Sequence, residues 1–290
     1  RGRRYLYIRN FMPHLGYNQT TGWPDKGSIR HEFYALKNSP ELSPSLRHFI
    51  SPTRTVEELY DCKNDPQNLN NLAKHSEHQT TLENMRAVLK NEMLQKKDLG
   101  VFPEADINRI TTEKPMYEKL RETDLNYKEI VDQLFKVGVS TEEVYTTALN
   151  SKSGTIRYWA LIGLSRFKSF TASTLKRLED LLQDEYDSVR IEAAALLHGL
   201  DQRQEAVQTL LQVLSSNNYS AKLHACRAIE LTGSQKFEDG MKLLAEETKD
   251  YRVGPATLVR DGDADLALFL GLSLNAYFKK ISDSWQPLFN

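Results

Sequence analysis

The sequence predicts an α+β chain, in which a small antiparallel sheet with a packed helix precedes an all-α solenoid of stacked helix pairs. Two observations predict this fold class. Strand-type runs, turn residues and most of the prolines lie in about the first 70 of the 290 residues, whereas the sequence is almost entirely helix-forming from about residue 122 onward. In this second part, one helical pattern recurs with periods of 33 and 32 residues.

Length and charge already exclude some functions. At roughly 150 residues per domain, the chain is long enough for two domains. Lys and Arg number 38 against 39 Asp and Glu, so the net charge of −1 does not favour nucleic acid as a partner. The sequence has neither an apolar run of about 18 residues, as a membrane span needs, nor a secretory signal pattern. Its start at Arg1 suggests a chain cut from a longer protein.

Three short strands are expected in the first part of the chain. Alternating aromatic and Ile residues favour strands over 3–11 and 31–36, and a run with Val, Leu and Tyr favours a third over 56–62. Gly, Pro and Asn over 12–28 predict turns between the first two strands. The three strands should form the small antiparallel sheet.

A long amphipathic helix is expected to cover this sheet. Residues 71–96 carry apolar side chains near helical spacing, with charges between them: Leu82, Met85, Val88 or Leu89, and Met93. The next stretch, 98–115, contains Gly100 and two prolines, and irregular chain of that length is unusual inside one domain. The predicted organisation is a first domain over 1–105, a linker over 106–122 and a helical repeat domain over 123–290.

The repeat can be followed residue by residue. Strings that start at Thr155, Ser188 and Ser220 align, and their apolar residues have the i, i+4, i+7, i+8 spacing of a buried helix face. These residues are Ile156, Ala160, Gly163 and Leu164; Val189, Ala193, Leu196 and Leu197; and Ala221, Ala225, Ala228 and Ile229. An earlier pair is expected where Ser140 and Glu143 have the spacing of a capping box. Because one helix pair cannot bury its own apolar face, the pairs must stack.

The units resemble HEAT-like repeats, in which a Val-Arg pair and an Ala-rich run open the first helix of each pair. Bases stand at equivalent positions, namely Arg157, Arg190 and Lys222. They could form a ladder on a concave binding face. They could equally pair with Asp184, Asp187 or a nearby Glu inside the stack, and the sequence leaves both arrangements open.

Spacing alone reveals no active site. His75 and His78 lie three residues apart, but no third ligand has the spacing of a metal motif. Asp261, Asp263 and Asp265 lack the Gly and Glu that complete a calcium loop, so a helix N-terminus explains them better. Gly-rich phosphate loops, G-x-S-x-G elbows and Cys/His pairs of catalytic spacing do not occur. No catalytic and no metal residue is assigned to this chain.

Three strings in the first 100 residues carry a family resemblance: RRYLYIRNFMPHLGYNQ, VEELYDCKNDPQNLNNLA and DLGVFPEAD. They resemble the carboxyl-terminal part of type I sulfatases, most closely the group like N-sulfoglucosamine sulfohydrolase and its bacterial relatives. The most specific piece runs from Glu58 to Ala73. In that family a strand ending in Leu-Tyr-Asp leads into an Asp-Pro turn and the start of the last helix. Here Tyr60 would pack the strand, and Asp65 with Pro66 would set the turn.

The resemblance implies a sulfuric ester hydrolase whose nucleophile is a formylglycine, made from the Cys or Ser of a C/S-x-P-x-R motif. A divalent cation, calcium, would lie beside it, held by carboxylates. This chain lacks the motif: Cys62 precedes KNDP, Cys226 precedes RAIE, and Ser43 and Ser51 have their prolines one place too early. The resemblance therefore implies an N-terminal catalytic domain as the partner that holds these groups. The two cysteines are expected to be buried free thiols.

Loops of the carboxyl-terminal sheet can line the substrate cleft in such enzymes. The resemblance therefore makes His14, Tyr17, Asn18 and Gln19 candidate substrate-lining residues, because their polar and aromatic mix suits a sulfated sugar. The alternative is an ordinary hairpin loop.

Two functions remain open. The chain is either the C-terminal segment of a sulfatase acting on sulfated carbohydrate, or a non-catalytic HEAT-repeat module that binds a protein partner. The sulfatase resemblance implies a periplasmic or extracellular location.

Overall fold

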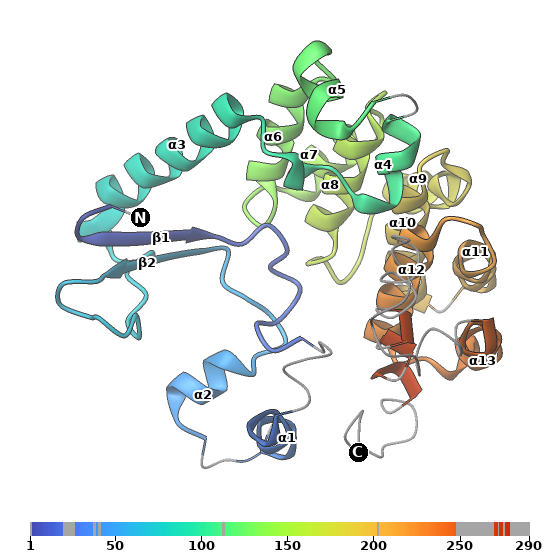
Figure 1. The fold of residues 1–290 in the computed structure, drawn as a ribbon, viewed down its shortest axis with the longest axis horizontal. Helices are drawn as coiled ribbons and strands as arrows, with labels where there is room; N and C mark the ends of the chain where they lie inside the picture. The colour runs from blue at the N-terminus through green and yellow to red at the C-terminus, as the bar shows by residue number, and fades with distance from the viewer. Residues whose placement is uncertain are drawn as a thin grey trace.

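The computed structural model describes residues 2–19, 27–36, 39, 42–111, 114–201, 203–247, 270–271, 273–274 and 276–278. Figure 1 shows two strands beside a long diagonal helix on one side, and a stack of shorter helices on the other. The described chain is mostly helical with one small antiparallel sheet, so the expected α+β class is confirmed at this level.

The sheet consists of strands β1 (Tyr5–Arg9) and β2 (Glu57–Asp61), which pair antiparallel over their full lengths. Two of the three predicted strands are thus confirmed. One face of the sheet holds a small apolar cluster under the long helix, made of Tyr5, Tyr7, Leu59, Leu72, Ala73, Leu82 and Met85. A two-stranded sheet is marginal by itself, so this cluster is needed to hold it together.

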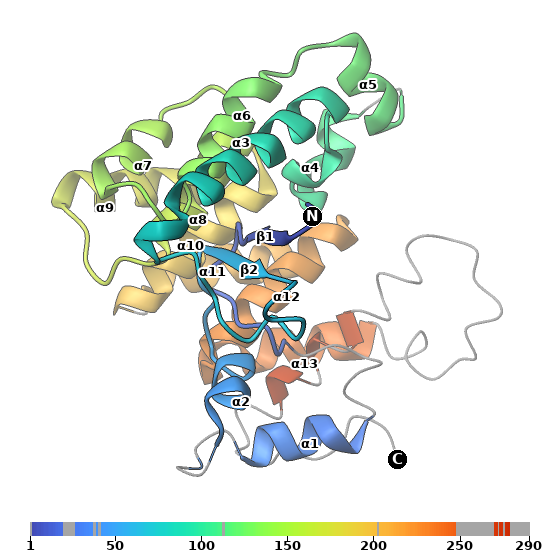
Figure 2. The ribbon, with the colours of Figure 1, turned by 90° about the vertical axis from the view of Figure 1, so that its left-hand side faces the viewer.

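The strand expected over 31–36 is wrong. These residues belong to helix α1 (Ser28–Ala35), which is followed by helix α2 (Pro44–Phe49). The outer edge of β2 is already occupied, because Asn71 Oδ1 accepts the Leu59 amide at 3.0 Å and the Leu72 amide donates to the Leu59 carbonyl at 2.7 Å. Figure 2 shows both short helices at the opposite end of the molecule from α5 and α6, which are described below.

The segment Glu58–Ala73 braces the sheet. Beyond its bond to Leu59, Asn71 accepts the Ala73 amide at 3.0 Å and donates to the Glu57 carbonyl at 3.1 Å. One amide side chain therefore fixes both β2 and the chain that returns along it. The residues that carry the family resemblance act here as structural ties.

The long helix predicted over 71–96 begins later, as a short 3-10 turn η2 (Ser76–His78) and helix α3 (Gln79–Lys96). Val88 is 62% exposed whereas Leu89 packs against the core, so Leu89 occupies the inward position. Arg86 donates to both carboxylate oxygens of Glu57 at 2.6 and 2.7 Å, which holds α3 across the sheet.

The irregular linker expected over 106–122 is mostly helical. The chain forms η3 (Leu99–Val101), α4 (Glu104–Ile110) and α5 (Met116–Glu122). Pro103 and Pro115 precede the first residues of α4 and α5 instead of marking loops, because a proline fits the start of a helix. Ala105 and Leu120 belong to the same core as the later helices. The division into 1–105, 106–122 and 123–290 stays a prediction.

In the region of the predicted repeat, helices follow one another in the predicted order. The first helices of the three aligned units pack side by side, with α10 between its two neighbours. Most of their aligned apolar residues are buried, although Ile156 and Leu196 are only half-buried. The elements are α6 (Tyr127–Lys136), α7 (Glu142–Ala148), α8 (Gly154–Leu164), α9 (Ala172–Asp180), η4 (Leu181–Gln183), α10 (Asp187–Asp201), α11 (Gln204–Leu214), α12 (Tyr219–Thr232), η5 (Gln235–Phe237) and α13 (Glu238–Glu247).

Several helix starts are capped by side chains, and one expected cap is absent. Ser153 accepts the Ile156 amide at the start of α8, and Asn218 accepts the Ala221 amide at the start of α12. The capping box expected at Ser140 does not form, because the cap position of α7 is the next residue, whose side chain accepts no amide there.

The three aligned bases pair within the stack. Arg157 donates to both oxygens of Asp184 at 2.8 and 2.7 Å, and both side chains are only 7% exposed. Arg190 pairs with Asp187, and Lys222 pairs with Glu247. Arg157 and Lys222 therefore join different elements, whereas Arg190 pairs within its own helix, and all three bases are ion-paired.

The sheet is tied to the helices through the end of β1. Buried Arg9 donates from Nη2 to the carbonyls of Phe135 and Val137 at 2.9 and 2.7 Å, at the C-terminal end of α6. Phe11 packs edge-on against Phe135, with ring centroids 5.2 Å apart. These contacts direct the loop after β1 toward the repeat helices.

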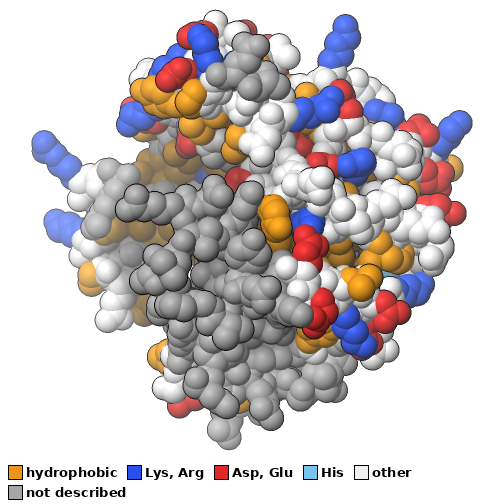
Figure 3. Space-filling view, turned by 45° about the vertical axis from the view of Figure 1, so that its right-hand side comes forward, with side chains coloured by type: hydrophobic (Ala, Val, Ile, Leu, Met, Phe, Trp, Pro, Cys, Tyr) orange, Lys and Arg blue, Asp and Glu red, His pale blue; other side chains and the backbone are white. Residues whose placement is uncertain are grey.

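The surface carries mixed charge. On the face shown in Figure 3, acidic and basic side chains alternate over the described part without gathering by sign. Among the described residues, no helix combines the length and apolarity needed to cross a membrane.

Candidate functional site

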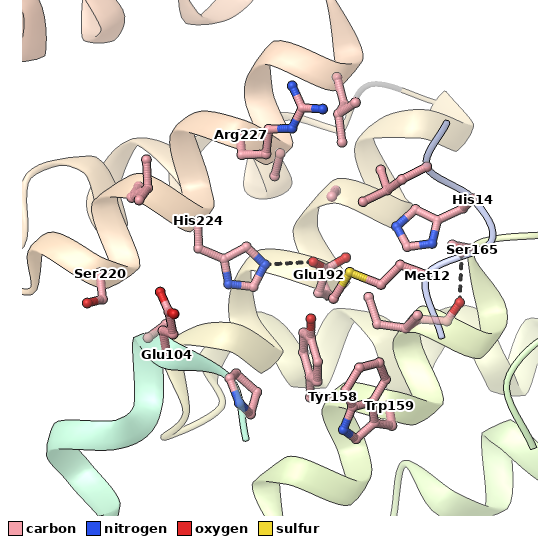
Figure 4. Close-up of a pocket in the computed structure, with 18 of the residues that line it drawn as sticks. Met12, His14, Glu104, Tyr158, Trp159, Ser165, Glu192, Ser220, His224 and Arg227 are labelled. Carbon is pink, nitrogen blue, oxygen red and sulfur yellow. Dashed lines mark hydrogen bonds and ion pairs between the residues drawn. The ribbon is translucent and has the colours of Figure 1, made fainter. Parts of the chain in front are cut away.

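A cavity of about 760 Å³ lies where the loop after β1 meets the repeat helices (Figure 4). Its walls come from η3 and from helices α4, α8, α10 and α12, while the loop contributes Met12, His14 and Leu15. Its volume is within the range of about 300–1,000 Å³ that is usual for small-molecule sites. Segments distant in the sequence thus build one concave site.

Two of the four predicted loop residues reach the helical side. His14 lines the cavity. Gln19 accepts a hydrogen bond from Arg227 of α12, with 3.0 Å between Gln19 Oε1 and Arg227 Nη2. Arg227 also pairs with Glu230 on its own helix, so its charge is compensated.

The other two predicted residues make their described contacts away from this cavity. The Tyr17 hydroxyl donates to Glu58 of β2, and the Tyr17 ring lies 5.0 Å from the ring of His48. Asn18 accepts a hydrogen bond from Arg30 of α1. The structure therefore does not bring all four residues together on one surface.

The cavity wall follows the repeat. The cavity is lined by Trp159, Glu192 and His224, and each of them lies four residues after the first residue of its aligned repeat string. Ile162, Ala195 and Arg227 line it as well, each seven residues after those starts. Equivalent positions of stacked helices lie on one face, so the cavity is the face that α8, α10 and α12 share.

A carboxylate and two imidazoles form the polar part of the cavity. Glu192 Oε1 lies 2.7 Å from His224 Nε2. Burial tends to raise the pKa of Glu192, but the hydrogen bond with His224 and the nearby imidazole of His14 keep that pKa below its ordinary value. Burial lowers the pKa of His14. At neutral pH the site therefore holds an ionised carboxylate beside a neutral His14.

Some hydrogen-bonding groups of the cavity have no protein partner. His14 Nδ1 is buried without a hydrogen-bond partner in the described part of the chain. Figure 4 shows the Tyr158 hydroxyl directed toward the Glu192–His224 pair, and within the described ranges this hydroxyl makes no hydrogen bond. Buried polar groups are usually satisfied, so these atoms are available to a ligand.

Aromatic rings form the opposite part of the wall. The Tyr158 and Trp159 rings meet edge to face, with centroids 4.9 Å apart. Trp159 donates from Nε1 to the Val101 carbonyl at 2.8 Å, which fixes its indole. The wall is continued by apolar side chains, among them Phe102, Ile162, Leu196, Leu223 and Leu231.

The residues singled out as metal or thiol candidates lie elsewhere. No group of three or more His, Cys, Asp and Glu in the described ranges could hold a metal ion. Asp261, Asp263 and Asp265 fall outside the described residues. Cys226 is a fully buried free thiol whose pKa is raised by burial, as expected. Cys62 is free but only half-buried.

The comparisons with known proteins point to sulfatases. No protein-family profile matches the chain. An ulvan-active sulfatase of Formosa agariphila is 31% identical over 107 residues, which is 37% of this chain and 18% of that protein. The chain thus matches less than a fifth of the length of this relative. It contains a sulfatase-related segment.

Proposed function

We propose that the chain is the C-terminal segment of a sulfatase, a sulfuric ester hydrolase that acts on sulfated carbohydrate. Its sheet and loop would complete the substrate cleft of a catalytic domain that precedes it. The observation that carries the proposal is the 31% identity over 107 residues with the ulvan-active sulfatase. That relative is named for activity on ulvan, so ulvan is the first substrate to test.

The backbone groups at the outer edge of β1 support the proposal that another domain lies beside this strand. Arg4 accepts the Cys62 amide and Asn10 donates to the Val56 carbonyl, next to the two ends of β2. In this pairing the odd-numbered residues of β1 direct their backbone groups away from β2. Within the described ranges, the amide and carbonyl of Tyr7 have no partner. An unpaired strand edge can accept another strand. We infer that the catalytic domain covers this edge.

The catalytic groups implied by the family do not fit the described residues. Neither cysteine lies in the motif that yields formylglycine, and the described ranges hold no carboxylate cluster that fits a metal site. In the proposed parent, formylglycine and a divalent cation, calcium, belong to the catalytic domain. No catalytic step is assigned to this chain.

The helical part is proposed to be a HEAT-like extension of the enzyme. The rival function is a protein-interaction module that uses the face of the helical stack. Arg157, Arg190 and Lys222 are ion-paired, which does not favour a basic ladder on such a face. A periplasmic or extracellular location belongs to the same proposal.

The test starts from the gene. The reading frame upstream of Arg1 should encode a C/S-x-P-x-R motif, and the full-length product should release sulfate from ulvan, measured by ion chromatography. A variant with Ala in place of the motif Cys or Ser is the control and should release none. A full-length product that lacks the motif and releases no sulfate from a panel of sulfated polysaccharides would refute the proposal.

A further inference from the structure

The cavity described above has a polar part and a mainly apolar part, and together they limit the chemical class of ligand that can bind. One part offers the Glu192–His224 pair, His14 Nδ1 and the Tyr158 hydroxyl. Most of the remaining lining is aromatic and aliphatic, and it also includes Glu104, Ser165, Ser220, Arg227 and Thr232. A ligand that satisfies both parts needs several groups that donate and accept hydrogen bonds along one edge, and an apolar face.

The charges oppose an anion deep in the cavity. Glu192 is ionised, Glu104 stands at the wall, and the positive charge of Arg227 is compensated by Glu230. A sulfate group placed there would meet carboxylates without a free counter-charge. A purely apolar ligand fits no better, because it would leave the carboxylate and His14 Nδ1 without partners.

A sugar ring meets these requirements. A hydroxyl group of the sugar can donate a hydrogen bond to Glu192 Oε2, which has no partner in the described ranges. It can also accept a hydrogen bond from the Tyr158 hydroxyl. The C–H face of a pyranose is apolar and can pack on apolar side chains that line the cavity, such as Leu196, Leu223 and Leu231.

We propose that this cavity, built by α8, α10 and α12 and closed by the loop that carries His14, is a subsite for a neutral pyranose ring of the carbohydrate substrate. The assignment rests on the substrate class named under the proposed function. It gives the repeat helices a direct role, in which they hold an unsulfated part of the chain while the sulfate ester lies in the cleft of the catalytic domain.

Binding to the 290-residue chain tests the subsite without catalysis. Ulvan oligosaccharides, before and after chemical desulfation, are titrated by calorimetry and followed by saturation-transfer NMR. Both forms should bind with similar affinity. Glu192→Gln keeps the shape of the side chain and should weaken binding by about tenfold or more, as expected for a lost charge-assisted hydrogen bond.

Two further variants separate ligand contacts from folding. Ala195→Leu fills the cavity without removing a polar group, and it should weaken binding while the thermal midpoint stays near that of the wild type. Glu185→Gln, at an exposed ion pair outside the cavity, is the matched control and should leave affinity unchanged.

Three results would overturn the subsite: no binding of either oligosaccharide form at millimolar concentration, binding only of the sulfated form, or affinity unchanged in both Glu192→Gln and Ala195→Leu. Failure of the proposed function is seen separately, as absence of sulfate release by the full-length product. Sulfate release with unchanged affinity in both variants would retain the enzyme and reject the subsite.

Discussion

At the residue scale, burial decides which ion pairs matter. Arg157 and Asp184 are both 7% exposed, and Arg157 also donates to the carbonyls of Ser151 and Lys152. Arg109 and Glu185 form an ion pair close by, but their side chains are 48% and 58% exposed. Water screens the exposed pair, whereas the buried pair depends on both of its members.

Removing one member of the buried pair should therefore be costly. We expect Asp184→Asn to lower the free energy of unfolding by about 3–5 kcal/mol, because a buried guanidinium loses its counter-charge. Glu185→Gln, at the adjacent position, should cost less than about 1 kcal/mol. Urea denaturation measures both, and equal losses would contradict this account of the stack.

His14 should make stability depend on pH. Burial lowers the pKa of His14 in the folded chain below its ordinary value of about 6.5. Its contribution to stability is thus complete above about pH 6.5 and is lost as the pH falls through the folded-state pKa. Glu192 stays ionised in this window, because its own pKa lies below the ordinary value.

We expect the free energy of unfolding to fall between about pH 7 and pH 5 more steeply in the wild type than in His14→Gln. Urea denaturation at a series of pH values gives the two curves. Parallel curves would show that His14 is not buried in a neutral form.

At the scale of elements, the close packing of α7 against α8 depends on a glycine. A Cβ atom added at Gly163 of α8 would overlap the ring of Tyr145 of α7. Tyr145 is fully buried, and its hydroxyl donates to the Lys136 carbonyl at 2.5 Å, so the ring cannot easily move. The absent side chain therefore sets how closely α7 and α8 approach.

Gly163→Ala should consequently reduce the free energy of unfolding by about 1–3 kcal/mol through overpacking. Gly199 provides the matched control, since it lies in α10 with nothing within 4 Å of an added Cβ. Gly199→Ala should stabilise the chain by about 0.5–1 kcal/mol through helix propensity. Thermal and urea denaturation of the pair check the sign of each effect.

At the scale of the whole molecule, Arg9 joins the sheet to the helices. Replacing it with Met keeps much of the volume but leaves the carbonyls of Phe135 and Val137 without their donor. Arg9→Met should lower the free energy of unfolding by about 2–4 kcal/mol. It should also speed amide hydrogen exchange in β1 and at the end of α6. Exposed Arg3→Met is the control, and similar exchange in both variants would contradict the role of Arg9.

The sequence was most informative where a period or a turn motif was strong. It predicted the two strands, the long helix and the aligned first helices of the repeat. It failed where aromatic residues over 31–36 suggested a strand, since the chain around Asn71 already occupies the edge of β2. It also missed α4 and α5, because prolines that suggested irregular chain precede these helices and a proline also suits a helix start.

The candidate site was predictable only in part. The sequence pointed to His14 in the loop, but it missed Glu192, His224 and Tyr158. Their signal was present, since Trp159, Glu192 and His224 share one repeat position. An alignment of repeats indicates which residues share a face, but it does not show whether that face is buried, exposed or open to a cavity.

By itself the sequence determined the order of the elements, the repeat register and the likeness to sulfatases, because these depend on local periodicity and short motifs. Only the tertiary structure decided that the bases of the repeat pair inside the stack. It alone brought His14 into one cavity with Glu192 and His224, which lie far away in the sequence. Charge pairing and cavities arise from contacts between distant residues, and such contacts have no signature in local sequence.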